Sequence, residues 1–216
     1  MQDLPLKGVR VIDYSHFLAG PYVGRCLAAM GAEVIKVERP GLGDAGRQHA
    51  HILDDQQSGY FLQLNMGKQG VSVNMKDPRG RDFMQRLCDS ADVFIENYRP
   101  GALDKLGLGY EALSAKHPRL IYCTLKGFLN GPYENRPALD EVVQMMGGLA
   151  YMTGLPDRPL RVGSSVNDIM GGMFAAIGIL AALRERETTG KGKLVRSEEH
   201  TSELQSRLHL VCRLLL

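Results

Sequence analysis

Residues 8–38 read GVRVIDYSHFLAGPYVGRCLAAMGAEVIKVE, and this stretch decides the fold of the chain. Its β-branched run at 9–14 predicts a strand that meets a loop at Ser15. Apolar residues at helical spacing over 22–30 predict a helix that stops at the following glycine, a residue common just past a helix C-terminus. A second β-branched run at 33–37 predicts the next strand. The stretch is therefore expected to form a β-α-β unit.

The same alternation of strands and helices continues downstream. Strands separated by helices favour a largely parallel sheet, so the expected fold class is α/β, a Rossmann-like parallel sheet flanked by helices. Residues 39–70 are polar and rich in Gly, Gln and His, which predicts a long loop. Further strands are expected at 71–75, 93–95 and 120–124, and further helices at 78–90 and 110–115.

The C-terminal third of the predicted domain is helical. A helix is expected over 140–152, broken near Gly147-Gly148. Residues 169–186 are apolar nearly all round, which predicts a buried helix. Its glycines would each cost about 1 kcal/mol relative to alanine in a helix interior. We therefore expect another backbone to approach this helix closely at one or more of Gly171, Gly172 and Gly178.

The end of the chain differs in character from the rest. Residues 196–206, RSEEHTSELQS, show no credible apolar face, and they can be back-translated into the common sequencing-library adapter. We therefore expect residues 196–216 to be adapter-derived and not part of the fold, and residues 1–195 to form the domain. The alternative is a genuine divergent C-terminus.

Composition and charge limit the classes of function that this chain can have. The chain has 26 Lys and Arg against 24 Asp and Glu, and a net charge of +2 gives no electrostatic footprint for nucleic acid or an anionic membrane. No run approaches 18 apolar residues, and MQDLPLKGVR lacks the apolar core of a signal peptide. These observations predict a cytoplasmic globular enzyme. Widely spaced cysteines predict thiols, with neither a disulfide framework nor a metal site: Cys26, Cys88, Cys123 and Cys212.

The loop after the first strand is a candidate ligand site. Such a loop opens a helix at the carboxyl end of a strand, where open α/β sheets bind ligands. Residues 15–21 read SHFLAGP and lack the GxGxxG glycines, which argues against a dinucleotide oxidoreductase. Glu38 follows the second strand, where a ribose-binding acid often lies. Arg39 is either a phosphate contact or a solvated charge.

Asp168 is the most informative acid. It directly precedes the long apolar helix, and its simplest interpretation is an N-cap. A helix N-terminus also favours an ionised carboxylate, so the position suits a nucleophile. No GxSxG elbow is present, and His49 and His51 lack a third metal ligand and are expected in an exposed loop.

Seven motifs in order resemble the class III CoA-transferase family (CaiB/BaiF, formyl-CoA transferase-like). The resemblance runs from about Leu4 to Val195, which it identifies as the N-terminal part of that family's large domain. The motifs are GVRVIDYSHFLAGPY (8–22), MGAEVIKVERPGLGD (30–44), NMGKQGVSVNMKDPRGR (65–81), ADVFIENYRPGALDKLGLGYEAL (91–113), PRLIYCTLKGF (118–128), RVGSSVNDIMGG (161–172) and IGILAALRERETTGKGK (177–193).

The resemblance implies transfer of CoA from an acyl-CoA thioester to a free carboxylic acid. Asp168 occupies the position of the family's nucleophilic aspartate, which carries the CoA as an aspartyl thioester between two anhydrides. An aspartate of ordinary pKa, about 3.9, is ionised at pH 7 and needs no general base. CoA would be a substrate, and no tightly bound cofactor is implied. The family also implies an interlocked homodimer.

The resemblance also implies a CoA site. Lys105 stands where relatives often carry Arg, which keeps the charge but loses the bidentate fork. Leu139 stands where many relatives have Tyr, so the resemblance does not define that side of the acyl pocket. The residues that match family CoA contacts are His16, Leu18, Ala19, Arg39, Val73, Lys76, Asn97, Tyr98, Arg99 and Lys105.

Two alternatives stay open. One is an acyl-CoA racemase or epimerase of the same family, but residues 136–140, RPALD, lack the His of the GHD-type pair that this branch uses. The other is a non-catalytic fragment, because the family's glycine-rich loop and second domain lie beyond this sequence. That alternative predicts an insoluble or inactive chain with uncovered apolar surface.

Overall fold

The computed structural model describes residues 4–50, 52–53, 57–128, 131–136 and 138–198. Six parallel strands form one sheet in the order β3-β2-β1-β4-β5-β6. The expected α/β class is confirmed. The strands are β1 (Arg10–Tyr14), β2 (Glu33–Glu38), β3 (Gln69–Ser72), β4 (Val93–Glu96), β5 (Ile121–Lys126) and β6 (Leu194–Glu198).

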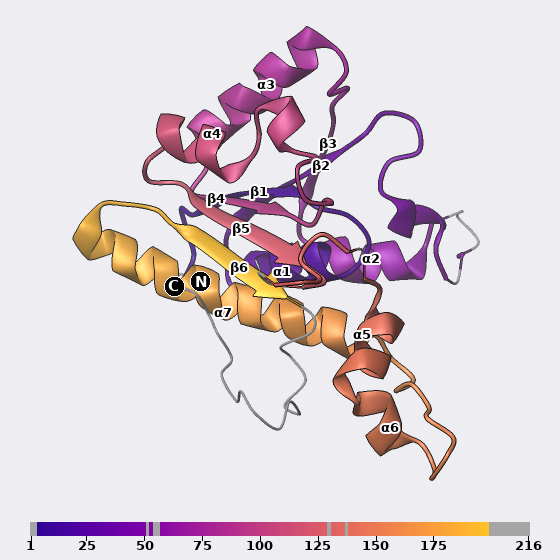
Figure 1. Cartoon of the computed structure of the whole chain (residues 1–216). Coiled ribbons are helices and arrows are strands. Elements are labelled where there is room, and N and C mark those ends of the chain that lie inside the picture. The colour runs from indigo at the N-terminus through magenta and orange to yellow at the C-terminus, as the bar shows by residue number, and fades with distance from the viewer. Residues whose placement is uncertain (1–3, 51, 54–56, 129–130, 137, 199–216) are drawn as a thin grey trace.

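Helices cover both faces of the sheet, as Figure 1 shows. The α-helices are α1 (Ala19–Ala29), α2 (Gly59–Asn65), α3 (Pro78–Asp89), α4 (Tyr110–Lys116), α5 (Asp140–Gly147), α6 (Leu149–Thr153) and α7 (Val166–Thr189). Two 3₁₀ turns are η1 (Ala45–Gln48) and η2 (Asp104–Leu106).

Alternating side chains of β1 separate two apolar cores. Val11 packs with Leu27 of α1 and Ile179 of α7 on one face. Ile12 packs with Met84 of α3 and Leu113 of α4 on the other. The chain moves outward from β1 to β3 and then returns to β4 on the other side of β1. The carboxyl ends of β1 and β4 therefore flank the topological switch point, where α/β sheets bind ligands.

Several predicted boundaries shift. Helix α1 begins at Ala19, three residues before the expected start, because Pro21 is tolerated in a first turn. The prediction of one long loop over 39–70 is wrong, since that segment contains η1, α2 and the start of β3. Helix α2 is capped by the Ser58 hydroxyl, which accepts the Phe61 N–H. The break between α5 and α6 is confirmed at Gly148, which has a φ of 93°.

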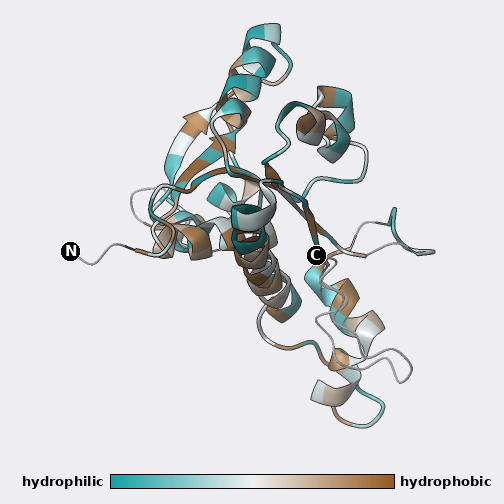
Figure 2. Cartoon of the chain, turned by 90° about the vertical axis from the view of Figure 1, so that its left-hand side faces the viewer, coloured by the Kyte–Doolittle hydropathy of each residue, from teal (hydrophilic) through white to brown (hydrophobic). Residues whose placement is uncertain are grey.

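Helix α7 lies along one face of the sheet and across α1 (Figures 1 and 2). Figure 2 shows its near, C-terminal end as hydrophilic and the turns behind it as more hydrophobic. Among the described helices it alone has the length and apolar composition of a membrane span, and its packing on α1, β5 and β6 accounts for that composition. The expectation of a buried helix holds for one side of α7 only, because Met173 and Ile177 on its other side are about half exposed.

The expected close backbone approach occurs at Gly172. A Cβ placed there would lie 3.0 Å from the Ala19 carbonyl oxygen and 3.0 Å from Cδ1 of Tyr22. A side chain at this position would require α1 to give way by a few tenths of an ångström, so glycine lets α7 lie this close to the start of α1. The crossing brings the first turn of α7 beside the loop that follows β1.

Strand β6 pairs with β5 as far as Glu198. It therefore continues three residues past Val195, where the sequence predicts the end of the domain. The remainder of the predicted tail, residues 199–216, lies outside the described residues. The assignment of residues 196–216 to an adapter stays a prediction.

A cluster of buried opposite charges underlies the carboxyl end of β1. Lys68 Nζ lies 2.7 Å from Asp13 Oδ2 and also donates to the Pro21 carbonyl and to Asn65. Lys36 Nζ lies 2.8 Å from Asp44 Oδ2 and 3.9 Å from Asp13 Oδ1. Burial opposes ionisation of Asp13, but Lys36 and Lys68 outweigh it and hold the pKa of that carboxyl below its ordinary value.

Replacing Lys68 with methionine should strand the Asp13 carboxylate in the core. Removing one partner of a buried pair costs about 3–5 kcal/mol, so urea unfolding at pH 7 should show a loss of that size. The double variant Asp13→Asn/Lys68→Met should recover much of the loss, because it leaves no lone charge. Equal stability of Lys68→Met and the wild type would contradict this account.

The same pair has a pH dependence. Because the folded-state pKa of Asp13 is lowered, its contribution is fully present above the ordinary value of 3.8 and is lost as the pH falls through the folded-state pKa. The stability difference between wild type and Lys68→Met should therefore narrow as the pH falls, because the less compensated acid of the variant becomes neutral at a higher pH than the paired acid of the wild type.

Candidate active site

A cavity of about 380 Å³ opens at the carboxyl ends of β1, β4 and β5. Asp168 of α7 lines it together with six of the ten predicted CoA contacts. Those six are His16, Leu18, Ala19, Asn97, Tyr98 and Arg99. The fold therefore brings Asp168 beside two loops at the carboxyl ends of β1 and β4, the place where α/β sheets bind ligands.

Buried polar groups hold the loop after β1. The Phe17 N–H donates to Asp44 Oδ1 at 3.0 Å, and Lys36 Nζ donates to the Ser15 carbonyl at 2.5 Å. Phe17 has a φ of 68°, in the left-handed region that non-glycine residues rarely adopt. Lys36 thus bonds the residue before His16, and Asp44 bonds the residue after it. Together they stabilise this strained backbone.

Asn97 ties the loop after β4 to the loop after β1. Its Oδ1 accepts the His16 N–H at 2.9 Å, and its Nδ2 donates to the His16 carbonyl at 2.7 Å. The Tyr98 ring lies 4.9 Å from the His16 ring in an edge-on contact. Burial is the largest influence on His16 and lowers its pKa. The charges of Asp44 and Glu96 raise that pKa and those of Lys36 and Lys126 lower it. The net lowering of the pKa favours a neutral imidazole at pH 7.

Asp168 is not the N-cap that the sequence predicts. Ser165 occupies the cap position without a capping side-chain bond, and Asp168 is the third residue of the helix. Its side chain is half-buried and lines the cavity. A carboxylate in the first turn is still favoured by the helix dipole.

The cap of α7 comes from Asp140, a buried residue of α5. Its Oδ1 accepts the N–H groups of Asn167 at 2.9 Å and of Asp168 at 3.3 Å. Gln144 supports this contact by donating to Asp140 Oδ2 and to the Ser164 carbonyl. Helix α5 thereby fixes the backbone from which Asp168 projects.

Aromatic side chains lie on the side of the cavity nearest α2. His49 lies 4.9 Å from both the Phe17 and Tyr60 rings, and it is exposed as expected, whereas His51 lies outside the described residues. Burial together with the charges of Asp168 and Asp44 raises the pKa of Tyr60. The raised pKa keeps the Tyr60 phenol neutral at pH 7.

Arg39 lines an adjoining cavity of about 270 Å³ together with His16 and Tyr98. Its side chain is exposed and its Nε donates to the Gly43 carbonyl. Glu38 does not have the free carboxylate of a ribose-binding acid, because Arg47 pairs with both of its oxygens at 2.7 Å. Among the three described cavities, none is lined by Val73, Lys76 or Lys105.

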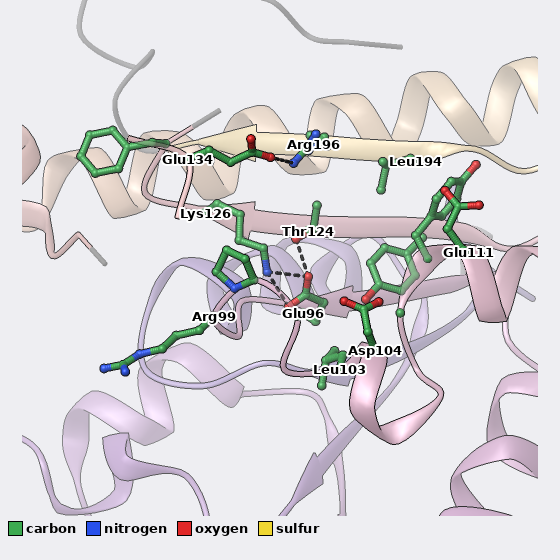
Figure 3. Close-up of a pocket in the computed structure, with 16 residues that line it drawn as sticks. Glu96, Arg99, Leu103, Asp104, Glu111, Thr124, Lys126, Glu134, Leu194 and Arg196 are labelled. Atoms are coloured by element: carbon green, nitrogen blue, oxygen red, sulfur yellow. Dashed lines mark hydrogen bonds and ion pairs between the residues drawn. The ribbon is translucent and has the colours of Figure 1, made fainter. Parts of the chain in front are cut away.

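Figure 3 shows a third cavity, of about 280 Å³, beside the first. At its floor Lys126 approaches both oxygens of Glu96, at 2.8 and 2.9 Å. Leu139, at the position where the resemblance does not define the acyl pocket, is exposed and lines the first cavity.

Sequence reasoning missed the residues that hold the site in place. Asp140 and Gln144 lie outside the seven motifs, and Lys36 and Lys126 lie inside motifs that gave them no role of their own. Each acts on a segment distant in the sequence. A buried lysine at the centre of a strand was the one visible signal: Lys36 interrupts the apolar run EVIKVE and has to be paired inside the fold.

Asp140→Ala should release the first turn of α7. We expect a loss of about 1–2 kcal/mol in unfolding free energy, because two helix N–H groups lose their acceptor. Glu141→Ala, at the adjacent and exposed position, is the matched control and should change stability by less than about 0.5 kcal/mol. Equal effects of the two substitutions in urea unfolding would argue against the capping role.

Comparisons with known proteins agree with this geometry. A sequence model of CoA-transferase family III matches residues 6–209. The chain is 43% identical over 193 residues to succinyl-CoA:glutarate CoA-transferase of Mus musculus, covering 88% of this chain and 44% of the mouse protein. It is 44% identical over 191 residues to acetyl-CoA:oxalate CoA-transferase of Acetobacter aceti, covering 87% and 49%.

The fold comparison gives the same result. A CaiB/BaiF family protein from Brucella suis superimposes with a TM-score of 0.87 at 40% identity, over 92% of this chain and 54% of that one. The chain spans about half the length of the curated relatives it matches. The chain belongs to CoA-transferase family III.

Proposed function

We propose that this chain carries the CoA-binding site and the nucleophile of an enzyme that transfers CoA from an acyl-CoA thioester to a free carboxylic acid. The observation that carries the proposal is the single cavity that Asp168 shares with the loops at 16–19 and 97–99. The named activities of the mouse and Acetobacter relatives support this class of reaction.

The proposed chemistry uses Asp168 as a covalent relay. An oxygen of its carboxylate attacks the thioester carbonyl, the C–S bond breaks, and CoA leaves as a thiolate. The thiolate attacks the aspartyl carbonyl of the resulting anhydride and releases the donor acid, leaving CoA on Asp168 as a thioester. The acceptor carboxylate then attacks the aspartyl thioester, which releases CoA thiolate and forms a second anhydride. The thiolate attacks the acceptor carbonyl of this anhydride, giving the new acyl-CoA and a free Asp168 carboxylate. Each step exchanges one acyl bond for another and needs no proton transfer.

The N-terminus of α1 is suited to polarise a carbonyl in this cavity. Leu18 and Ala19 line it, and the Leu18 N-cap position has no capping side-chain bond. Helix geometry leaves the first N–H groups of α1 without partners inside the helix. Such donors stabilise the oxyanion that forms when a thioester carbonyl is attacked.

Steady-state turnover is proposed to need protein beyond this chain. Relatives of named activity are about twice as long as this chain. Large apolar side chains are exposed on α5, on the α6 arm that projects from the body in Figure 1, and on the outer face of α7. They include Met145, Met146, Tyr151, Met152, Met173 and Ile177.

We further propose that this apolar surface is covered by a second copy of the protein in a homodimer. Association should bury large apolar side chains that are costly to leave in water. Sedimentation should therefore show a dimer, and replacing both Met152 and Tyr151 with glutamate should shift it toward monomer. A monomeric wild-type protein at all concentrations tested would rule the dimer out.

The covalent relay is tested by mass spectrometry. Incubation of the chain with succinyl-CoA, without an acceptor, should add the mass of CoA less one water to the peptide that contains Asp168. Asp168→Asn should abolish the adduct, because an amide is a far weaker nucleophile than a carboxylate. Asp157→Asn, an exposed change, is the control. An adduct retained in Asp168→Asn would disprove the assignment.

A further inference from the structure

Glu96 and Lys126 form a buried ion pair at the ends of neighbouring strands. Glu96 closes β4 and Lys126 closes β5, and the side chains are 4% and 16% exposed. The Thr124 hydroxyl also donates to Glu96 Oε1, as Figure 3 shows. Isolated charges are seldom buried this deeply, and this pair is satisfied by short contacts on both sides.

The pair holds the backbone of Tyr98 from both sides. The Tyr98 N–H donates to Glu96 Oε2 at 2.7 Å, and Lys126 Nζ donates to the Tyr98 carbonyl. One residue of the loop after β4 is therefore fixed by a carboxylate at its amide and by an ammonium at its carbonyl. Bonds to charged groups are stronger than neutral ones, so this loop residue is held firmly.

Tyr98 in turn connects to the loop after β1. Its ring lies 4.9 Å from the rings of His16 and Tyr14. The preceding residue, Asn97, bonds both backbone atoms of His16. A shift of the Tyr98 backbone would therefore move His16 as well, and both residues line the cavity that contains Asp168.

We propose that Glu96 and Lys126 are positioning residues for the CoA site, acting through the backbone of Tyr98 on the loops at 97–99 and 15–17. The inference rests on the proposed function, since it assigns what the two loops bind. Lys126 acts here through Tyr98, whose carbonyl it holds, while its charge is satisfied by Glu96.

The test uses the double variant Glu96→Gln/Lys126→Met of the whole chain. Lys126→Met alone would leave a buried carboxylate unpaired and could fail to fold. The double variant leaves no lone charge, keeps an acceptor for the Tyr98 N–H and removes the donor to the Tyr98 carbonyl. Circular dichroism and urea unfolding establish that the variant is folded before binding is measured.

The matched control carries the same two substitutions elsewhere. Glu185 of α7 pairs with Lys193, which precedes β6. Neither residue lines a described cavity, and both are partly exposed. Glu185→Gln/Lys193→Met therefore reproduces the chemical change without touching either loop.

Two readouts are taken from each protein: the dissociation constant for CoA by calorimetry, and the pKa of His16 by proton NMR, with its signal assigned through His16→Gln. Burial is the largest influence on His16, and the opposite charges of Glu96 and Lys126 leave together. Loosening of the loops should therefore raise the pKa of His16 toward its ordinary value of about 6.5. CoA binding should weaken about tenfold, and the control should match the wild type in both readouts.

Three other results overturn the proposal, each in a distinct way. Wild-type values in both readouts would show that the pair does not position the loops. Weaker CoA binding with an unchanged His16 would place Lys126 in direct contact with CoA, and a shifted His16 with unchanged binding would show that loop position is irrelevant to CoA. If the wild-type chain binds no CoA, the proposed function fails, and His16 alone then decides whether the pair positions the loops.

Discussion

The buried pairing of Lys68 with Asp13 and of Lys36 with Asp44 is the constraint on which the rest of the structure depends. Four charges below the carboxyl end of β1 are stable only when they satisfy one another. To do so they draw together β1, β2, the turn at η1 and the end of α2. The loop after β1 is bonded to both Lys36 and Asp44, and these bonds hold His16 and the strained Phe17 in place. Pairing that is required for folding therefore also shapes one wall of the candidate site.

A second constraint places Asp168 against that wall. Gly172 lets α7 approach α1 at van der Waals distance, and Asp140 caps the turn that precedes it. Neither contact would suffice alone: the glycine sets how close the helices lie, and the cap sets how the first turn begins. Asp168 lies one turn before Gly172, so the distance of this proposed nucleophile from the loop at 16–19 follows from helix packing. The position of Asp168 is thus set by the packing and capping of helices.

The sequence was sufficient for the features that depend on local patterns. Alternating β-branched runs and helical spacing predicted the parallel sheet, the break at Gly148 and the close approach of α7 to another backbone. The motifs pointed to six residues that do share a cavity with Asp168. Helix α2 was missed because its seven residues are too few for clear periodicity inside a polar segment. Asp140 and Lys126 were missed because their partners are distant in the sequence, and no local signal encodes such a contact. The N-cap assigned to Asp168 failed for the same reason, since the cap is supplied by another helix.

The distribution of charge around the cavity fits a reaction between anions. A carboxylate nucleophile, an acceptor carboxylate and the phosphates of CoA would repel one another unless positive groups lay nearby. The acids below the surface do not add to this repulsion, because Glu96 is paired with Lys126, Asp44 with Lys36, and Asp140 accepts helix amides. Three arginines with exposed side chains instead line the two adjoining cavities: Arg39, Arg99 and Arg136. Internal negative charge is thus neutralised within the fold, while positive charge faces the space that the anionic substrates would enter. This arrangement fits the proposed role of Asp168 as a carboxylate nucleophile among anionic substrates.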